Sequence, residues 1–222
     1  LRQPDGSIAA PGYFMPAAER AQLTGAIDRY VIERLLTWLA GNPQATARLG
    51  KCAINLTGWS VSDPALAPWI RAQVAAHGIP PQKLCFEITE SQAIASREHA
   101  HRLIVSLREL GASVSLDDFG TGLATFDYLK SFPFDYLKID GGFIKTIDNS
   151  PVDQAIVQAM VTVARTMGLR TIAEFVEHEG ITGYLRTAGV DYAQGYGLGR
   201  PQPLADLLLP EAGGGDVPAR RS

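Results

Sequence analysis

Two adjacent carboxylates, Asp117 and Asp118, end an apolar run in the stretch SVSLDDFGTGLATF, residues 113–126. Polar side chains also end the other β-rich runs of the chain, at Asn55, Glu87, Lys138 with Asp140, Glu174 with Glu177, and Gln194. Carboxylate and amide oxygens, with no His or Cys among them, are the ligands that hard ions such as Mg²⁺ or Mn²⁺ prefer over Zn²⁺ or copper. Because converging carboxylates repel one another in a partly desolvated site, we expect a cation among them.

This set of oxygen ligands suits the hydrolysis of a phosphodiester. Two divalent ions about 3.5–4 Å apart form the usual clamp for in-line displacement at phosphorus. The backbone turns through Gly120 and Gly122 directly after the two aspartates, so both carboxylates can reach one site and Asp117 can bridge two ions. Lys138 is no ligand for a cation, but its ammonium is suited to orienting the attacking water or contacting a phosphate oxygen. An Asp-Asp pair alone is more often a turn or a helix cap, so the prediction depends on the polar residues at all six strand ends.

The elements that must position these side chains are short strands. Apolar, β-rich runs are expected as strands at residues 51–56, 84–89, 113–117, 136–140, 169–174 and 191–195. Their alternation with helical segments predicts a parallel sheet covered by helices, either an open doubly wound sheet or a closed barrel, and six candidates favour the barrel. The carboxyl ends of the strands would converge on one mouth in a barrel, and would line one crevice in an open sheet.

Amphipathic helices are predicted where apolar residues recur at steps of three and four. One such face is Leu23, Ile27, Val31, Leu35 and Trp38, a second is Ala100, Leu103, Ile104, Leu107 and Leu110, and a third is Ile156, Met160, Val163 and Met167. Asp63 before Pro64 and Ser150 before Pro151 indicate helix N-caps. Gly111 and Gly168 indicate helix C-caps.

Composition excludes several functions. The chain has 222 residues, of which 46% are hydrophobic, enough for one soluble globular unit. A net charge of −3 without a basic stripe argues against polymeric nucleic acid as a partner, and no apolar run is long enough to cross a membrane. Cys52 and Cys85 lack metal or redox spacing, so we expect reduced core residues and a cytoplasmic location.

Six motifs, in this order and spacing, resemble the EAL-domain family of cyclic-di-GMP phosphodiesterases. They are NLT (55–57), FEITES (86–91), DDFGTG (117–122), LKID (137–140), AEFVE (173–177) and QGYGLGRP (194–201), and the resemblance covers nearly the whole chain. It implies an α/β fold, a modified TIM-like (β/α)8 barrel whose first strand runs antiparallel. It also implies Mg²⁺- or Mn²⁺-dependent hydrolysis of cyclic di-GMP to linear pGpG, in bacterial second-messenger signalling.

The resemblance implies metal ligands residue by residue. Asn55, Glu87 and Asp117 match the family's ligands for one ion. Asp117, Asp118 and Glu174 match the residues around a second ion.

Other positions of the site follow from the same resemblance. Lys138 matches the lysine that positions the attacking water, and Glu90 resembles the glutamate that steadies the loop after DDFG. Gln194, Asp140 and Glu177 match positions in or supporting the site.

The resemblance also implies partners. The loop GTGLATFDYL, residues 120–129, is implicated in dimer contacts across the family, so a homodimer is expected. The family's Glu-x-Leu-x-Arg motif should stand just before residue 1, so we expect it upstream with the first strand and with sensory or diguanylate-cyclase-like domains, which could anchor the parent protein in a membrane. Residues 1–210 are expected to form the EAL-type domain and residues 211–222 a disordered tail.

Two motifs depart from the commoner family sequences. The chain reads AEFVE where the family usually has AEGVE, and GLATF where GYSSL is commoner. Strand alternation predicts that the Phe175 side chain points away from Glu174 and Glu177.

Two alternatives stand beside the phosphodiesterase. Some family members have lost catalytic residues and act as cyclic-di-GMP receptors, but here Asp118, Lys138 and Glu174 all keep the catalytic residue type. A metal-dependent barrel lyase follows from strand-end carboxylates alone, if the resemblance is set aside.

Overall fold

The computed structural model describes residues 3, 5–120 and 128–208 of the chain. The disordered tail expected at 211–222 lies outside these residues, as does most of the loop at 120–129.

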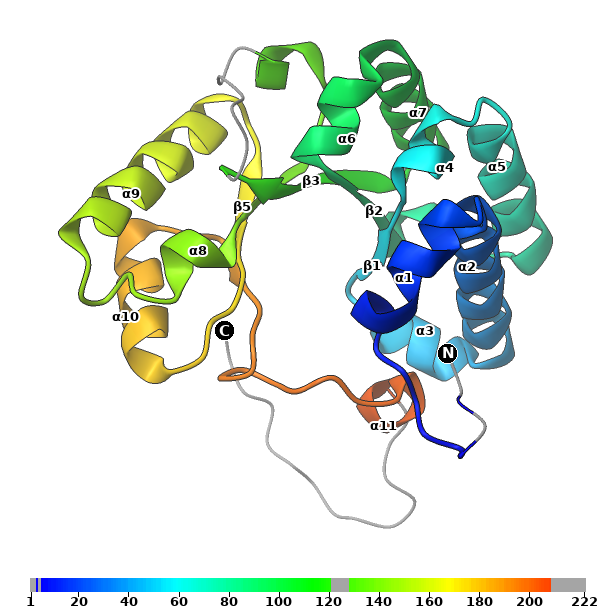
Figure 1. Cartoon of the computed structure of the whole chain (residues 1–222), viewed down its shortest axis with the longest axis horizontal. Coiled ribbons are helices and arrows are strands. Elements are labelled where there is room, and N and C mark those ends of the chain that lie inside the picture. Colours follow the sequence, from blue (N-terminus) through cyan, green and yellow to red (C-terminus); the bar gives the residue numbers. More distant parts are fainter. Residues whose placement is uncertain (1–2, 4, 121–127, 209–222) are drawn as a thin grey trace.

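One parallel sheet forms the centre of the molecule. Its strands, in sheet order and in chain order, are β1 (Cys52–Asn55), β2 (Leu84–Thr89), β3 (Ser113–Phe119), β4 (Tyr136–Ile139), β5 (Arg170–Ala173) and β6 (Tyr192–Ala193). The sheet curves and the helices lie outside it, and within the described residues β1 and β6 are not paired with each other (Figure 1). This half-barrel confirms the predicted modified TIM barrel, with strands in the six predicted places.

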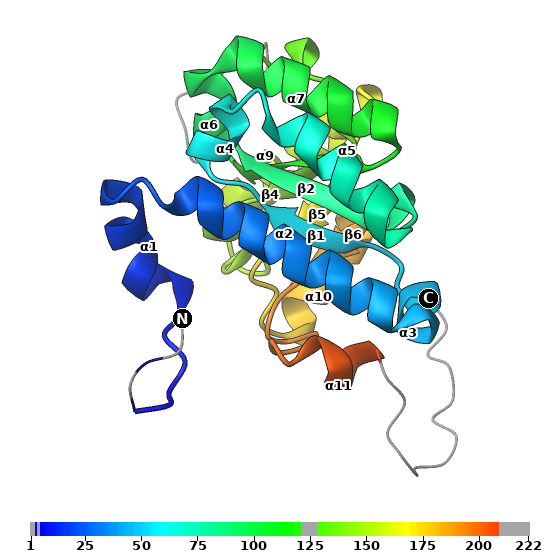
Figure 2. The ribbon, with the colours of Figure 1, turned by 90° about the vertical axis from the view of Figure 1, so that its right-hand side faces the viewer.

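Helices connect and cover the strands. They are α1 (Pro11–Arg20), α2 (Thr24–Gly41), α3 (Pro43–Arg48), α4 (Gly58–Ser62), α5 (Leu66–His77), α6 (Glu90–Ala95), α7 (Arg97–Leu110), α8 (Gly141–Ile144), α9 (Pro151–Thr166), α10 (Glu179–Ala188) and α11 (Leu204–Leu208), with 3-10 turns at Pro81–Lys83 and Tyr128–Ser131. Figure 2 shows α2, α5 and α7 stacked side by side on the outer face of the sheet. No helix in the described part of the chain is both long and apolar enough to cross a bilayer.

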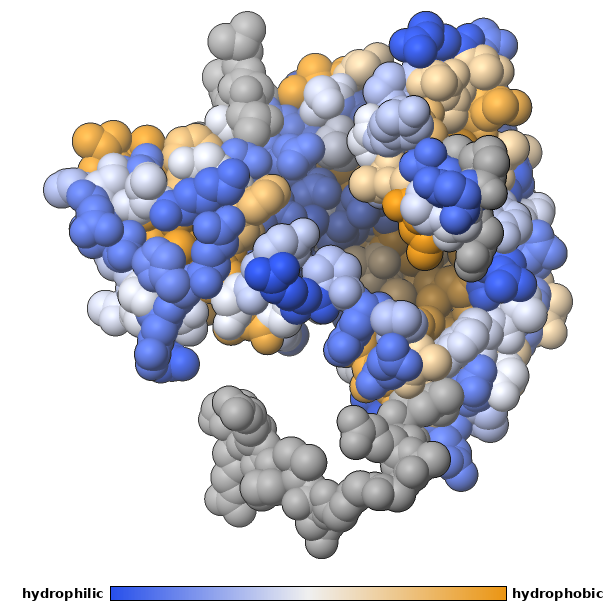
Figure 3. Space-filling model, turned by 60° about the horizontal axis from the view of Figure 1, so that its bottom comes forward, coloured by the Kyte–Doolittle hydropathy of each residue, from blue (hydrophilic) through white to orange (hydrophobic). Residues whose placement is uncertain are grey.

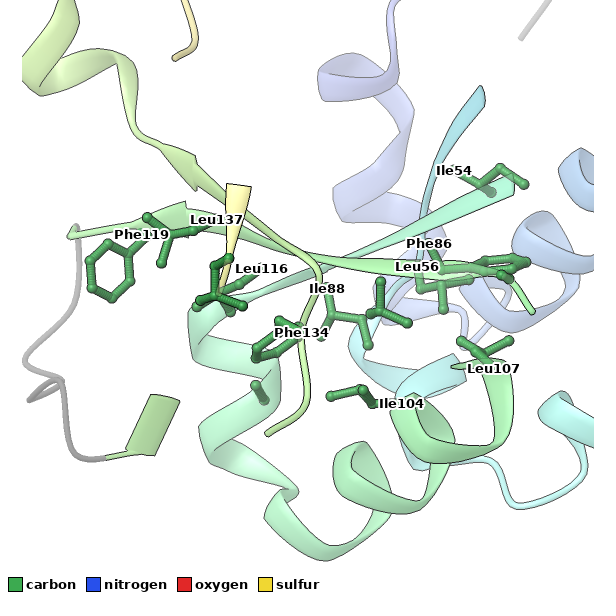
Figure 4. Packing of buried hydrophobic residues seen from close by; sticks show 14 of the residues in the cluster. Ile54, Leu56, Phe86, Ile88, Ile104, Leu107, Leu116, Phe119, Phe134 and Leu137 are labelled. Carbon is green, nitrogen blue, oxygen red and sulfur yellow. The ribbon is translucent and has the colours of Figure 1, made fainter. Parts of the chain in front are cut away.

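The hydrophobic core lies between the outer face of the strands and the helices. Phe86, Ile88 and Leu116 are fully buried there, beside Ile104 and Leu107 of α7 (Figure 4). Alternate strand residues face this core, and the residues between them face the inside of the half-barrel. Truncation of a core side chain of this size, such as Phe86→Ala, typically destabilises a fold by about 3–5 kcal/mol.

Helix α2 buries a face that only partly matches the predicted one, in which Leu35 and Trp38 pack against the core as half-buried residues. Its buried residues are Thr24, Asp28, Ile32, Leu36 and Leu39, whereas Leu23 and Val31 of the predicted face are exposed. The apolar period is shared by two neighbouring faces of this helix, and the face that contains Asp28 packs inward. The faces predicted for α7 and α9 lie mostly in or against the core.

The helix ends follow the predicted chemistry with one exception. Ser150 caps α9 by accepting a hydrogen bond from the backbone N–H of Asp153, and Gly111 ends α7 at φ +98°. Asp63 is not an N-cap, because α5 begins only at Leu66; its Oδ1 instead accepts a hydrogen bond from Ala65 N–H in the turn before the helix.

Polar and aromatic side chains tie together the amino ends of the strands. Lys51 Nζ donates to Ser113 Oγ at 2.6 Å, and Arg170 donates to the Tyr192 hydroxyl at 2.9 Å. Tyr192 also packs edge-on against Tyr136, with 6.0 Å between ring centroids.

On its open side the molecule is hollowed, and hydrophobic side chains line part of the hollow (Figure 3). Both cysteines are free, with Cys85 buried and Cys52 half-buried.

Candidate functional site

A single ammonium group joins three carboxylates at the carboxyl ends of the strands. Lys138 Nζ lies 3.0 Å from Glu87 Oε2, 2.9 Å from Asp117 Oδ1 and 2.8 Å from Glu174 Oε1. These four residues come from β4, β2, β3 and the residue after β5, and all four are buried. The convergence of strand ends predicted from the sequence is therefore present.

The protonation equilibria of this cluster are displaced by burial. Desolvation raises the pKa of the Glu87 and Glu174 carboxyls, and the attraction of Lys138 offsets this only in part. Desolvation lowers the pKa of Lys138, but the ion pairs with its three carboxylate neighbours outweigh that effect and raise it above 10.5. Burial is thus the cause for the two carboxyls and ion pairing is the cause for the lysine, because one positive charge serves three negative ones. The cluster keeps net negative charge when all three carboxyls are ionised.

An irregularity in β3 turns Asp117 and Asp118 toward the same site. The register of β3 with β4 shifts between Leu116 and Phe119, and Asp118 has a left-handed φ of +55°. Asp117 Oδ1 accepts a hydrogen bond of 2.9 Å from Asp118 N–H. This bulge interrupts the strand alternation that would send neighbouring side chains to opposite faces. The predicted turn through Gly120 is present at φ +101°, while Gly122 lies outside the described residues.

Asp117, Asp118 and Glu174 form a group that could hold a metal ion. One carboxylate oxygen from each of them lies within 4.8 Å of the others. Desolvation and the neighbouring Asp117 charge raise the pKa of Asp118. Asn55 pairs in register with Glu87, so its amide belongs to the same edge of the sheet. The described histidines lie on helices or helix ends outside this group.

Gln194 fixes the carboxylate of Glu174. Its Nε2 donates a hydrogen bond of 2.8 Å to Glu174 Oε1. The segment after β6 continues to pair with the segment after β5, since Val176 N–H donates to Gln194 O and Gly197 N–H donates to Val176 O. A side chain on Gly195 would overlap the backbone of Val176, which explains the need for glycine beside the glutamine.

The three other predicted positions lie around the cluster. Glu90, buried at the start of α6, accepts a hydrogen bond of 3.0 Å from Gly120 N–H. Asp140 caps α8 by accepting from Gly142 N–H at 2.8 Å. Glu177 is exposed and lines a mouth cavity of about 770 Å³ together with Glu174 and Gln194.

Phe175 also lines this mouth cavity. Strand β5 ends at Ala173, and Phe175 has a left-handed φ of +53°, so strand alternation no longer applies. Its ring packs on Gly141, and Lys145 Nζ lies 4.4 Å from the ring centroid.

Sequence analysis missed Asp28, a buried residue of α2 that holds the NLT segment. Its Oδ2 accepts hydrogen bonds from Thr57 N–H at 2.8 Å and from the Thr57 hydroxyl at 2.7 Å. Asp28 thereby fixes the chain two residues after Asn55. The sequence carried one sign of it: an acidic residue four positions before Ile32, on a helix face whose other residues are suited to burial.

A second cavity, of about 710 Å³, lies at the amino ends of the strands and carries no comparable cluster. Its lining includes Lys51, Arg108 and Arg170. Lys51 donates to Ser113 and Arg108 pairs with Asp135, both in the same wall, and Arg170 donates to Tyr192. This cavity therefore reads as the base of the half-barrel.

Comparison with known proteins identifies relatives over nearly the whole chain. The EAL domain family matches residues 1–201. The chain is 45% identical over 206 residues to the cyclic di-GMP phosphodiesterase PdeB of Shewanella oneidensis, covering 92% of this chain and 24% of that protein. It is 36% identical over 208 residues to the cyclic di-GMP phosphodiesterase PdeF of Escherichia coli, covering 94% of this chain and 28% of that protein. The chain thus spans about a quarter of the length of these curated relatives.

Solved structures share the fold. A complex of the PaMucR phosphodiesterase with c-di-GMP superimposes with a TM-score of 0.84 at 33% identity, covering 94% of this chain and 84% of that one.

Proposed function

This chain belongs to the EAL domain family, and from that membership and its carboxylate cluster we propose that it hydrolyses cyclic di-GMP to linear pGpG. The observation that carries the proposal is the meeting of Glu87, Asp117 and Glu174 at the Lys138 ammonium, next to Asp118. Relatives over more than nine-tenths of the chain are cyclic di-GMP phosphodiesterases, which supports the choice of substrate.

The donors of the cluster fit a hard divalent cation. They are carboxylate oxygens whose pKa values are raised first by burial and then by the charges of their carboxylate neighbours, and a bound cation would offset both effects. We assign Asn55, Glu87 and Asp117 to one Mg²⁺ or Mn²⁺ ion, and Asp117, Asp118 and Glu174 to a second. When bound, these ions would stabilise negative charge on the phosphoryl oxygens and make water a better nucleophile.

The residues of the chain then have distinct tasks. Lys138 Nζ has a carboxylate partner for each of its three hydrogens, so it would orient the attacking water toward phosphorus, in line with the 3′ oxygen, when a bound ion draws one of those carboxylates away. The water oxygen gives up a proton and forms a new bond to phosphorus, the bond to the 3′ oxygen breaks, and the proton balance closes when that oxygen takes up one proton to become the 3′ hydroxyl of pGpG. Gln194 orients Glu174, and Glu90 steadies the end of β3.

We also propose how this domain is placed in the whole protein. Residues 1–210 form the EAL-type domain of a larger cytoplasmic or membrane-anchored protein, with sensory or diguanylate-cyclase-like domains upstream and a homodimer as its assembly. The length of the curated relatives supports further domains, and one relative is the bifunctional diguanylate cyclase and phosphodiesterase MucR of Pseudomonas aeruginosa.

The test is cyclic di-GMP turnover in Mg²⁺, Mn²⁺ or EDTA, with pGpG measured by chromatography. We expect turnover in either metal, none in EDTA, and loss of at least about 100-fold in Asp117→Asn, since Asp117 would bridge both ions. Glu98→Gln, an exposed acid on α7, is the matched control and should turn over normally. Binding without turnover in both metals would instead identify a receptor.

A further inference from the structure

The backbone at Phe175 is in a conformation that aromatic residues rarely adopt. Among the described residues other than glycine, only Gln22, Asp118 and Phe175 have a positive φ. Asp118 belongs to the carboxylate cluster, and aspartate tolerates the left-handed region better than most residues do. A phenylalanine gains no local hydrogen bond there, whereas glycine would adopt the same φ without penalty. Strain of this kind at a site is a reason to ask what the side chain does.

The ring is fixed in place but not buried. Its Cβ, Cγ and Cδ2 atoms pack so closely on Gly141 that any side chain at Gly141 would overlap them, and Lys145 Nζ lies over the ring. Nevertheless 49% of Phe175 is exposed. The packing on α8 therefore holds the ring rigidly while leaving half of its surface available.

Phe175 lines the mouth cavity next to Glu174 of the carboxylate cluster. The cavity of about 770 Å³ is within the usual size range of ligand pockets. Its wall holds Glu174 and Glu177 on the Phe175 side, and Tyr196 and Arg200 from the segment after β6. A wall with an aromatic ring next to hydrogen-bonding groups suits a planar heterocycle that has an apolar face and a polar edge.

We propose that Phe175 contacts a nucleobase of the substrate and thereby contributes to the preference of the site for a dinucleotide. This inference rests on the proposed function and adds a contact residue to it. The competing explanation is that the ring only covers Gly141 and α8. That explanation predicts that removal of the ring leaves substrate affinity unchanged. It also predicts that glycine at position 175 leaves the conformational energy of the backbone unchanged or lowers it.

The test compares Phe175→Gly and Phe175→Asn, both compatible with a left-handed φ, with Phe175→Tyr, which keeps the ring. In Mn²⁺, we expect KM for cyclic di-GMP to rise between about 5-fold and 100-fold in the first two variants, because a base contact with an aromatic ring contributes on that scale. The kcat and the Mn²⁺ affinity should stay within about twofold, and Phe175→Tyr should restore KM. Tyr30→Ala, an exposed aromatic on α2, is the control and should leave KM unchanged.

The outcomes separate this inference from the proposed function. An unchanged KM in Phe175→Gly and Phe175→Asn, in an enzyme that turns over cyclic di-GMP, would overturn the base contact alone. If the protein binds cyclic di-GMP without hydrolysing it, the same contact is tested by measuring the Kd of each variant by calorimetry. A protein that neither binds nor hydrolyses cyclic di-GMP would overturn both statements, and an equal loss of Mn²⁺ affinity would assign Phe175 to the support of the carboxylates.

Discussion

The Oε2 atom of Glu90 accepts a hydrogen bond of 3.0 Å from the backbone N–H of Gly120, so the first residue of α6 is joined to the end of β3. Glu90 is only 3% exposed, and the bond closes a short path from β2 through α6 to the pair of aspartates. The position of Asp118 therefore depends on a side chain that lies outside the carboxylate cluster.

Removing this acceptor is predicted to reduce turnover and stability together. Glu90→Ala leaves the Gly120 N–H without its partner, and an unsatisfied buried group destabilises by about 1–3 kcal/mol. Glu90→Gln keeps an acceptor oxygen and should retain most of the stability. Urea unfolding and metal-dependent turnover of both variants measure the effect. Equal behaviour of the alanine and glutamine variants would contradict the role of the hydrogen bond.

Lys138 is predicted to stabilise the metal-free protein as well as to serve in turnover. Lys138→Met leaves three buried carboxylates without their ammonium, and breaking a buried ion pair typically destabilises by about 3–5 kcal/mol. Part of this loss at pH 7 should be recovered at a lower pH, below the raised pKa values of Glu87 and Glu174, because protonation of these carboxyls removes their repulsion. Chemical denaturation in EDTA at the two pH values measures it. The same stability loss at both values would show that charge is not the cause.

Mn²⁺ affinity is predicted to fall as the pH is lowered, and to begin falling at a higher pH than it would with exposed carboxylates. Burial raises the pKa of Glu87, Glu174 and Asp118, and a proton on any of them competes with the cation. Below their folded pKa values, Mn²⁺ affinity should fall by roughly tenfold per pH unit for each proton displaced. The sign for stability is opposite. Because the folded pKa values exceed the unfolded ones, these three groups favour the metal-free fold at low pH, and that contribution is lost as pH rises through the raised values. Calorimetric Mn²⁺ titrations between pH 5 and 8 should show the slope, and a constant affinity would exclude competition.

Asp28 is predicted to control the position of Asn55 from the outside of the sheet. Asp28→Ala removes the acceptor for both the N–H and the hydroxyl of Thr57, and we expect a loss of about 1–3 kcal/mol in unfolding free energy with weaker Mn²⁺ binding. Asp28→Asn keeps one acceptor and should lie between alanine and the native protein. Glu33→Ala, an exposed acid on the same helix, is the control. Unchanged metal binding in Asp28→Ala would limit its role to stability.

The contact between Gly141 and Phe175 predicts strong coupling between two substitutions. Gly141→Ala should destabilise the native protein, because the new methyl group overlaps the base of the Phe175 ring rather than its flexible end. In a Phe175→Gly background the same change should be nearly neutral. A double-mutant cycle by thermal or urea unfolding should give a coupling energy of about 1–3 kcal/mol. Additive effects would contradict the packing.

Patterns that depend on local chemistry were predictable from the sequence. Apolar runs identified all six strands, and a strand-end rule brought Glu87, Asp117, Lys138 and Glu174 together before any distance was known. Prediction failed where tertiary contacts choose between locally equal options. Two faces of α2 have a similar apolar period, and the hydrogen bonds of Asp28 accompany the burial of the face that periodicity did not select.

The left-handed residues show a second limit of sequence reasoning. Strand alternation gives no basis for the direction of the Phe175 side chain, because β5 ends at Ala173 and Phe175 has a positive φ. The letters AEFVE alone do not mark this conformation, but the glycine of the commoner family sequence AEGVE indicates it, since glycine adopts a positive φ without penalty.

Because the strands follow one another in the sheet in chain order, the charged residues of the site leave the ribosome in the order in which their strands pair. After β1, each strand pairs with one strand that was synthesised before it. The sheet can therefore grow by one βα unit at a time, and most of the loops that it closes are short. Glu87 and Asp117 emerge first, as negative charges on neighbouring strands. Lys138 follows on the very next strand and Glu174 on the one after it. If the sheet forms in this order, Glu87 and Asp117 stand as two like charges on neighbouring strands until Lys138 joins on β4 and pairs with both.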